Sequence, residues 1–294
     1  MSSKTVKNLP IDWRDYVEMC KPRVVLLMLL TVVVGMYLAA PGWIDLYLVC
    51  SALVGIGMCA GSAAAINHLV DRRIDSIMAR TQKRPVAHGR VSVTQALWFA
   101  AIMGVSGLMI LTFFVNKLTA LLTFLTLIGY AGVYTGYLKR ATSQNIVIGG
   151  LAGAAPPLLG WTAVTNHLDP QALLLVLIIF TWTPPHFWAL AIYRFEEYRH
   201  AQIPMLPVTH GIQYTKLNVY LYTVLLVVVS ILPVIVGMSG SIYLIAALVL
   251  GARFLFWSHK LYHSEKAAVA MQVFRFSIVY LMLMFLFLLV DHYV

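Results

Sequence analysis

The chain passes without a break from an apolar segment into a polar one: residues 46–66 read LYLVCSALVGIGMCAGSAAAI, and residues 67–75 read NHLVDRRID. About 20 apolar residues in a helix are enough to cross the hydrocarbon core of a bilayer, and the first segment has that length without a charge. The second segment adds an amide, two carboxylates and two guanidinium groups, with no proline or glycine to end the helix. The junction predicts a membrane-spanning helix with a polar site at one end.

Similar apolar segments recur along the chain. Its 294 residues are 61% hydrophobic and 11% charged, with a mean hydropathy of +0.83. A soluble domain does not bury that much apolar surface. We therefore predict an all-α polytopic membrane protein with about nine transmembrane helices in one bundle. The predicted spans are Val24–Ala40, Leu46–Ile66, Ser92–Phe114, Leu118–Leu138, Asn145–Val164, Gln171–Ile192, Leu217–Gly237, Ile242–Trp257 and Gln272–Val290.

The basic residues predict the orientation of these spans, because cytoplasmic loops of membrane proteins are enriched in Lys and Arg. With a cytoplasmic N-terminus, all of the 21 Lys and Arg residues except Lys117 fall on the cytoplasmic side. We expect a protein of the bacterial cytoplasmic (inner) membrane with its C-terminus outside. The net charge of +10 follows from this pattern. Nucleic acid is not expected as a partner, since no soluble basic domain is present to bind it.

The polar loops are distributed unequally between the two sides. Residues 67–91 and 193–216 are long and cytoplasmic, whereas the outer connections are only a few residues long. No linker separates the spans, so residues 1–294 are expected to form one transmembrane domain that begins with a cytoplasmic segment, residues 1–23. Because binding and catalytic groups concentrate in long loops, we expect these two loops to form the active site.

Asn67, Asp71 and Asp75 recur every four residues beyond the second span. This spacing places one amide and two carboxylates along one helix face. Neighbouring carboxylates repel each other unless a cation joins them, and Mg²⁺ usually binds one or two carboxylates together with substrate phosphate oxygens. We predict these three residues as magnesium ligands. Ionisable groups at membrane depth are costly and usually functional, which favours this interpretation over a helix end with solvated charges.

Cationic residues accompany this motif. Arg80, Lys83 and Arg84 follow it, and Lys139 and Arg140 close the fourth span on the same side. Arg suits bidentate contacts to phosphate, and Lys supplies a point charge. Acidic metal ligands beside a basic cluster are what a metal-bridged diphosphate requires. The alternative is that Lys139 and Arg140 only mark the cytoplasmic face.

A second polar segment, RFEEYR at residues 194–199, follows the sixth span on the same side. Its glutamates are candidates for a second cation site or for the other edge of the same diphosphate, although adjacent glutamates at a helix end are often only solvated. The hexamer IPMLPV at residues 203–208 contains two prolines and cannot continue a helix. It is predicted as an ordered loop that dips back toward the bundle as a lid or an apolar wall.

Two proline pairs interrupt predicted spans, Pro156-Pro157 in the fifth and Pro184-Pro185 in the sixth. Proline removes a backbone donor, so the freed carbonyl groups need partners in the protein or in a cavity. The pairs are consistent with a cavity between these two spans or with simple kinks. His186, beside the second pair, is interpreted either as a ligand or as a hydrogen-bonded core residue.

These motifs resemble those of the intramembrane prenyltransferases of the UbiA type. Asn67-x3-Asp71-x3-Asp75, followed by Arg80-Thr81-x2-Arg84-Pro85, is similar to the first acidic motif of that family. Further strings resemble the branch that acts on protoheme IX, the heme O synthases. These strings are KPR at 21–23, KRATSQNIVIGG at 139–150, APPL at 155–158, WTPPHFWAL at 182–190 and IPMLPV at 203–208.

The resemblance implies a nine-helix bundle that transfers farnesyl from farnesyl diphosphate to a vinyl group of protoheme IX and produces heme O. It also implies Mg²⁺ as cofactor, membrane lipid as surroundings, and heme A synthase or a terminal oxidase as a protein partner. On this basis Glu197 and Tyr198 join the catalytic set, and His186 and Trp188 are assigned to the porphyrin. The expected diphosphate contacts are Arg23, Arg80, Lys83, Arg84, Lys139, Arg140 and Arg194.

The sequence departs from the family pattern at one position. Heme O synthases typically have Asp-Tyr where this chain has Glu197-Tyr198, and the longer side chain puts direct metal ligation there in doubt. Two alternatives stay open. Prenylation of an aromatic acid or quinone precursor shares the first motif, and transport of heme or of a phosphorylated lipid is compatible with broken helices and intramembrane charge. The absence of an internal sequence repeat disfavours the transporter.

Overall fold

The computed structural model describes residues 12–294, and at Arg140 it describes the backbone only. No β-strand occurs in this part of the chain, so the predicted all-α class is confirmed. The helices are α1 (Trp13–Met19), α2 (Pro22–Leu38), α3 (Leu46–Val70), α4 (Arg72–Ile77), α5 (Val93–Phe114), α6 (Lys117–Leu127), the π-helix η1 (Ile128–Leu138), α7 (Lys139–Ala141), α8 (Asn145–Ala154), α9 (Pro156–Thr165), α10 (Pro170–Tyr193), α11 (Phe195–His200), α12 (Leu206–His210), α13 (Ile212–Ile235), α14 (Ser241–His263) and α15 (Ala267–Tyr293).

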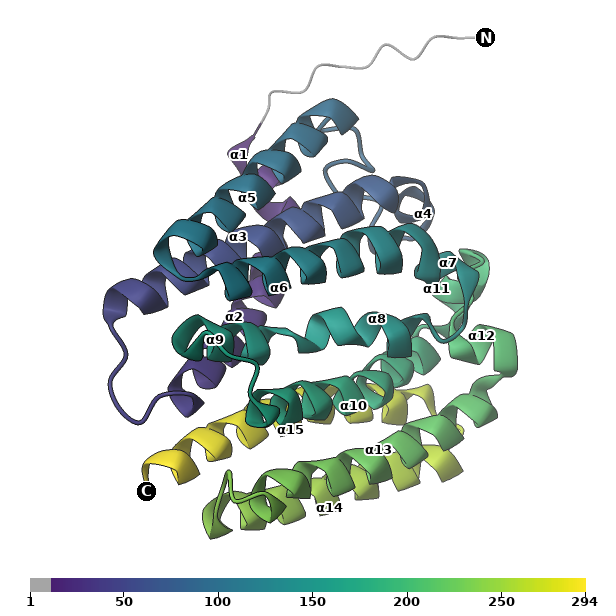
Figure 1. Ribbon diagram of the computed structural model, residues 1–294. Helices are drawn as coiled ribbons and strands as arrows, with labels where there is room; N and C mark the ends of the chain where they lie inside the picture. The colour runs from purple at the N-terminus through teal and green to yellow at the C-terminus, as the bar shows by residue number, and fades with distance from the viewer. Residues whose placement is uncertain (1–11) are drawn as a thin grey trace, which may run out of the picture.

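The long helices pack side by side in one bundle (Figure 1). The short helices α4, α11 and α12 gather at one end of it, and the C-terminus lies at the other. Within residues 12–294, eight spans are long and apolar enough to cross a membrane, and the bent pair α1–α2 gives up to nine. This confirms the predicted number of spans and the polytopic membrane class.

The eighth and ninth spans are longer than predicted. The eighth continues as α14 to His263, and the ninth begins at Ala267. Arg253 does not end α14, because its guanidinium group lies 5.1 Å from the ring centroids of both Phe256 and Trp257. A cation held over aromatic rings remains within an apolar helix at low cost.

The two proline pairs have different consequences. Pro156-Pro157 breaks the fifth span at Ala155 and starts α9, where the first residues need no backbone donor. The prediction of a break at Pro184-Pro185 is wrong, because α10 continues through both residues. This part of α10 is buried among α8, α13 and α15. Neighbouring helices hold a proline-containing turn in place where an isolated helix would break.

Both long polar loops contain short helices. The end of α3 and the short helix α4 cover the first part of residues 67–91, and the short helices α11 and α12 lie within residues 193–216. In the proline-containing hexamer, Ile203 and Met205 are buried, Met205 is extended, and α12 begins at Leu206. Pro207 lies in the first turn of α12, where a proline is tolerated. The first three residues of the hexamer are therefore buried or half-buried chain without helical structure, and the last three begin α12.

α2 and α9 approach each other closely at two glycines. A Cβ atom on Gly35 would lie 2.1 Å from the Pro157 carbonyl oxygen, and one on Gly160 would lie 2.1 Å from the Val32 carbonyl oxygen. Small residues allow such backbone contact between membrane helices, which packing in lipid depends on. These two glycines fix the position of α2 and thereby of Lys21, the residue that precedes it.

Gly35→Ala and Gly160→Ala are expected to lower the free energy of unfolding by roughly 1–3 kcal/mol each, because the added methyl group overlaps backbone atoms that cannot move aside alone. Thermal unfolding of the detergent-solubilised protein measures the effect. Gly153→Ala is the matched control, since a Cβ atom there meets nothing within 4 Å. Equal stability of the Gly35→Ala variant and the control would contradict the close approach.

Candidate active site

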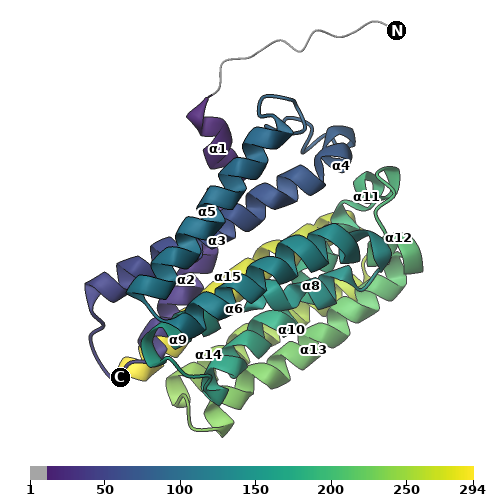
Figure 2. The ribbon, with the colours of Figure 1, turned by 45° about the horizontal axis from the view of Figure 1, so that its top comes forward.

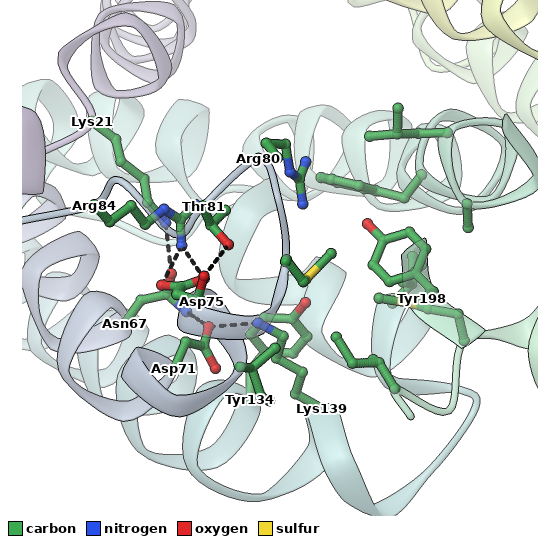
Figure 3. A pocket seen from close by; sticks show the side chains of 18 of the residues that line it. Lys21, Asn67, Asp71, Asp75, Arg80, Thr81, Arg84, Tyr134, Lys139 and Tyr198 are labelled. Atoms are coloured by element: carbon green, nitrogen blue, oxygen red, sulfur yellow. Dashed lines mark hydrogen bonds and ion pairs between the residues drawn. The ribbon is translucent and has the colours of Figure 1, made fainter. Parts of the chain in front are cut away.

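A cavity of about 200 Å³ lies at the end of the bundle where α3, α4, η1 and α10 to α12 meet (Figure 3). It gathers residues from both long polar loops. The predicted site residues that line it are Asn67, Asp71, Asp75, Arg80, Arg84, Lys139 and Tyr198. Its remaining lining is mainly apolar and aromatic.

Asn67, Asp71 and Asp75 lie along one face, as their spacing predicts. The helix assignment is interrupted at Asp71, yet the helical hydrogen bonds persist, from Asp71 N to Asn67 O (3.0 Å) and from Asp75 N to Asp71 O (2.8 Å). The Asn67 amide also donates from Nδ2 to Asp71 Oδ2 at 2.8 Å. All three residues are buried, with 4% or less of their surface exposed. Such burial of two carboxylates requires compensating charge.

Three cations supply this charge (Figure 3). Lys139 Nζ lies 2.5 Å from Asp71 Oδ2, and Arg84 Nη1 donates to both Asp75 oxygens at 2.8 Å. Lys21 Nζ donates to Asn67 Oδ1 at 2.6 Å. Cations outnumber carboxylates, so the cavity is suited to an anion.

The acidic face fits the predicted Mg²⁺. Asp71 Oδ1 is buried and accepts no hydrogen bond, which leaves a carboxylate oxygen available as a ligand. In residues 12–294 no three His, Cys, Asp or Glu side chains gather as a complete ligand set. A divalent ion here would have two carboxylates and the Asn67 amide from the protein. Such sets bind Mg²⁺ when phosphate oxygens and water complete them.

The π-helix η1 forms the aromatic wall of the cavity. Tyr130 and Tyr134 both line it, with ring centroids 5.5 Å apart. Thr135 Oγ1 donates to the Tyr130 carbonyl group at 2.8 Å. Stretches of π-helix are rare in proteins, and those that occur often lie at functional sites. Apolar side chains from α10 and from the segment after α11 (Phe187, Leu190, Ile203, Met205) line the same cavity.

Other predicted residues do not line the cavity. Arg23 and Lys83 are exposed, and the side chain of Arg140 is outside the described part of the chain. Glu197 pairs with Arg194 at 3.2 Å, so this segment brings only Tyr198 to the cavity. The reason is helical geometry, since consecutive residues of α11 point in different directions.

His186 and Trp188 lie in the core. The His186 ring is stacked on Trp182 and Phe274, with centroids 4.2 and 4.5 Å away, and its Nδ1 lies 2.7 Å from Ser277 Oγ. Trp188 is 1% exposed and packs edge-on against Tyr222. Neither side chain lines the cavity. Their assignment to the porphyrin stays a prediction, and the observed contacts are those of a packed core.

Lys21 is the main residue that sequence reasoning missed. The string KPR at 21–23 contains it, but the expected phosphate contact in that string is Arg23. Lys21 has φ 50° and precedes Pro22 at the start of α2. A positive φ in a residue other than glycine is uncommon and marks a constrained position. In the sequence, this position is marked by Pro22, which begins a new helix. The axis of that helix, α2, is bent by 51° from that of α1; Figure 2 shows the two helices.

A sequence profile of the UbiA prenyltransferase family matches residues 28–289. That match covers most of the chain and includes the acidic face and the residues of the aromatic wall. The chain belongs to the UbiA prenyltransferase family.

Relatives that match this chain over nearly its full length identify its branch of the family. The chain is 79% identical over 293 residues to the protoheme IX farnesyltransferase of Legionella pneumophila (strain Corby), with 100% of each chain covered. It is 59% identical to protoheme IX farnesyltransferase 1 of Pseudomonas paraeruginosa (strain DSM 24068 / PA7), covering 96% of this chain and 94% of the relative. Within its family, the chain therefore belongs to the protoheme IX farnesyltransferases, or heme O synthases.

Solved structures show the same fold at low sequence identity. A digeranylgeranylglyceryl phosphate synthase aligns with a TM-score of 0.80 at 19% identity, over 95% of this chain and 98% of that one. A UbiA homologue from Archaeoglobus fulgidus, solved with GPP and Mg²⁺, aligns with a TM-score of 0.63 at 15% identity, over 93% and 99% of the two chains. The arrangement of helices described here is thus that of known intramembrane prenyltransferases.

The position of Lys21 predicts its effect on anion binding. Lys21→Met is expected to weaken magnesium-dependent binding of inorganic diphosphate about tenfold or more, because a charged hydrogen bond contributes roughly 1.5–3 kcal/mol. Calorimetric titration of the solubilised protein measures this. Arg23→Met is the matched control and should change the affinity little, since Arg23 is exposed. An equal loss in the two variants would contradict the geometry.

Proposed function

We propose that the protein transfers the farnesyl group of farnesyl diphosphate to a vinyl group of protoheme IX, giving heme O and inorganic diphosphate. The observation that carries the proposal is the buried acidic face of residues 67–75, which meets three cationic side chains at a cavity that is also lined by apolar and aromatic side chains. The names of the two relatives, which specify farnesyl transfer to protoheme IX, support the choice of substrates.

The cationic side chains would stabilise the leaving group. Arg84, Lys139 and Lys21 surround the acidic face, and Arg80 lies exposed at the cavity without an ion pair in the described part of the chain. Donors fixed in advance lower the barrier where negative charge develops, here on diphosphate as the allylic C–O bond breaks. Bound Mg²⁺, held by Asn67, Asp71 and Asp75, would add Lewis-acid stabilisation of the same oxygens.

The apolar wall would protect the carbon chemistry. Tyr130 and Tyr134 line the cavity with aromatic side chains, and Phe187, Ile203 and Met205 add apolar side chains to the lining. Ring faces stabilise a nearby cation, which suits an allylic carbocation. The vinyl carbon of protoheme forms the new C–C bond as the C–O bond breaks. Water then adds to the resulting benzylic-type cation and loses a proton, which leaves a hydroxyethylfarnesyl group.

The cellular setting belongs to the same proposal. The distribution of Lys and Arg supports a cytoplasmic N-terminus, an outer C-terminus and an active site at the cytoplasmic face of the bacterial inner membrane. Heme O would then pass to heme A synthase or to a terminal oxidase. Protoheme and farnesyl diphosphate would enter from the cytoplasmic side or from the surrounding lipid.

Asp71→Asn is expected to reduce heme O formation at least about 100-fold while the protein stays folded, because it removes a buried charge from the proposed metal and diphosphate site. Turnover of the purified protein with farnesyl diphosphate, protoheme and Mg²⁺ measures this. Asp45→Asn is the control, since Asp45 caps the far end of α3 and Asn caps a helix equally well. Near-normal turnover by folded Asp71→Asn protein would rule out the role of Asp71.

Expression in cells followed by analysis of extracted hemes tests the acceptor directly. New heme O is expected with the parent protein and not with Asp71→Asn. Prenylation of a hydroxybenzoate without use of protoheme would instead indicate the aromatic-acid prenyltransferase. Failure to release diphosphate from farnesyl diphosphate, with uptake of substrate, would indicate a carrier.

The orientation is tested by labelling single cysteines in a background without Cys20, Cys50 and Cys59. A cysteine in place of Lys117 should react with a membrane-impermeant maleimide from the outer side. A cysteine in place of Lys266, which lies between α14 and α15, should react only after the membrane is opened. The reverse pattern would overturn the predicted orientation.

A further inference from the structure

The Arg90 side chain joins α1, which ends two residues before Lys21, to the loop after α4, which carries Arg84. Its Nη1 lies 2.6 Å from Asp15 Oδ1, and its Nη2 lies 3.3 Å from Glu18 Oε2, both on α1. The same Nη2 donates to the Lys83 carbonyl oxygen at 2.7 Å. One guanidinium group thus binds α1 on one side and the loop after α4 on the other.

The α1 side of this junction leads to Lys21. Met19 is fully buried in a cluster with Ala65 of α3 and with Val86 and Val91 of the loop. The chain then turns at Cys20 and Lys21 into α2. Because Lys21 follows α1 by two residues, the position of α1 determines where its ammonium group reaches Asn67 Oδ1.

The loop side of the junction leads to Arg84. Lys83, whose carbonyl group accepts from Arg90, is the neighbour of Arg84 in the chain. The Arg90 amide also donates to the Pro85 carbonyl oxygen at 2.9 Å. The loop between residues 83 and 90 is therefore closed on itself by Arg90, and Arg84 projects from it onto Asp75.

We propose that Arg90, held by Asp15, is a positioning residue that sets Lys21 and Arg84 on the acidic face and thereby fixes the affinity for diphosphate. This inference rests on the proposed function, since it assigns Arg90 a part in the same site. Arg90 does not line the cavity and acts only through Lys21 and Arg84.

Burial distinguishes this junction from an ordinary surface ion pair. The side chain of Asp15 is 5% exposed, whereas in the pair of Arg199 and Glu196 the side chains are 63% and 70% exposed. Exposed pairs contribute little, but loss of one partner of a buried pair leaves an unpaired charge. Three acceptors also require the planar fork of arginine, which a lysine ammonium group does not reproduce.

The test uses the full-length protein in detergent, with inorganic diphosphate and Mg²⁺ as the probe and farnesyl diphosphate as the substrate. Arg90→Gln and Asp15→Asn should each weaken diphosphate binding and raise KM for farnesyl diphosphate about tenfold or more, with a much smaller change in kcat. Displacement of charge-bearing groups by about 1 Å is enough for effects of this size. Arg90→Lys should fall between the parent and Arg90→Gln.

Two comparisons separate positioning from general stability. In an Arg84→Ala background, Arg90→Gln should weaken diphosphate binding by clearly less than tenfold, because Arg84 is one of the two residues that Arg90 positions. Arg199→Gln, which breaks an exposed ion pair on α11, should change diphosphate binding less than about twofold. Glu18→Gln, which removes the more exposed acceptor of Arg90, should have a small effect as well.

The inference is overturned if folded Arg90→Gln protein binds diphosphate within twofold of the parent, or if its full effect persists in the Arg84→Ala background. Should Arg90→Gln fail to fold, Asp15→Asn and Arg90→Lys provide the same test. Because the probe is inorganic diphosphate, the result stands even if the acceptor is not protoheme. A parent protein that binds no diphosphate would instead contradict the proposed function itself.

Discussion

Two carboxylates, Asp71 and Asp75, are buried side by side at the end of an apolar helix bundle. Each buried ion costs several kcal/mol in desolvation, and loss of one partner from a buried pair costs about 3–5 kcal/mol. The compensating cations come from three separate segments: Lys21 before α2, Arg84 after α4, and Lys139 after η1. The need to bring these segments together determines how this end of the bundle is built.

The same arrangement suits phosphate chemistry. Cations already held in place need little reorganisation when negative charge develops on a leaving diphosphate, which is the main advantage of a preorganised site. Asn67, Asp71 and Asp75 with their cationic partners form one part of the cavity lining, and the rings of Tyr130 and Tyr134 with the side chains of Ile203 and Met205 form another. Polar groups suited to a diphosphate and apolar side chains suited to a prenyl group therefore line the same cavity.

The features that could be predicted from the amino-acid sequence are those that depend on local spacing and on composition. The apolar segments gave the membrane class and the number of spans, because each span must satisfy its backbone hydrogen bonds internally. Four-residue spacing placed Asn67, Asp71 and Asp75 on one face, because the helical period is a local property. Short strings of residues also identified the family, which the comparisons bear out.

Which side chains from distant segments meet depends on the folded arrangement of the helices. This arrangement places Lys21, rather than Arg23, at the cavity. It brings Tyr198 but not Glu197 to the cavity, and it buries His186 in the core. It also kept α10 continuous through its proline pair, where neighbouring helices support the turn. These outcomes depend on helix directions and on contacts between residues far apart in the chain. Local sequence patterns do not encode them, since a side chain's surroundings are set by the packing of the whole bundle.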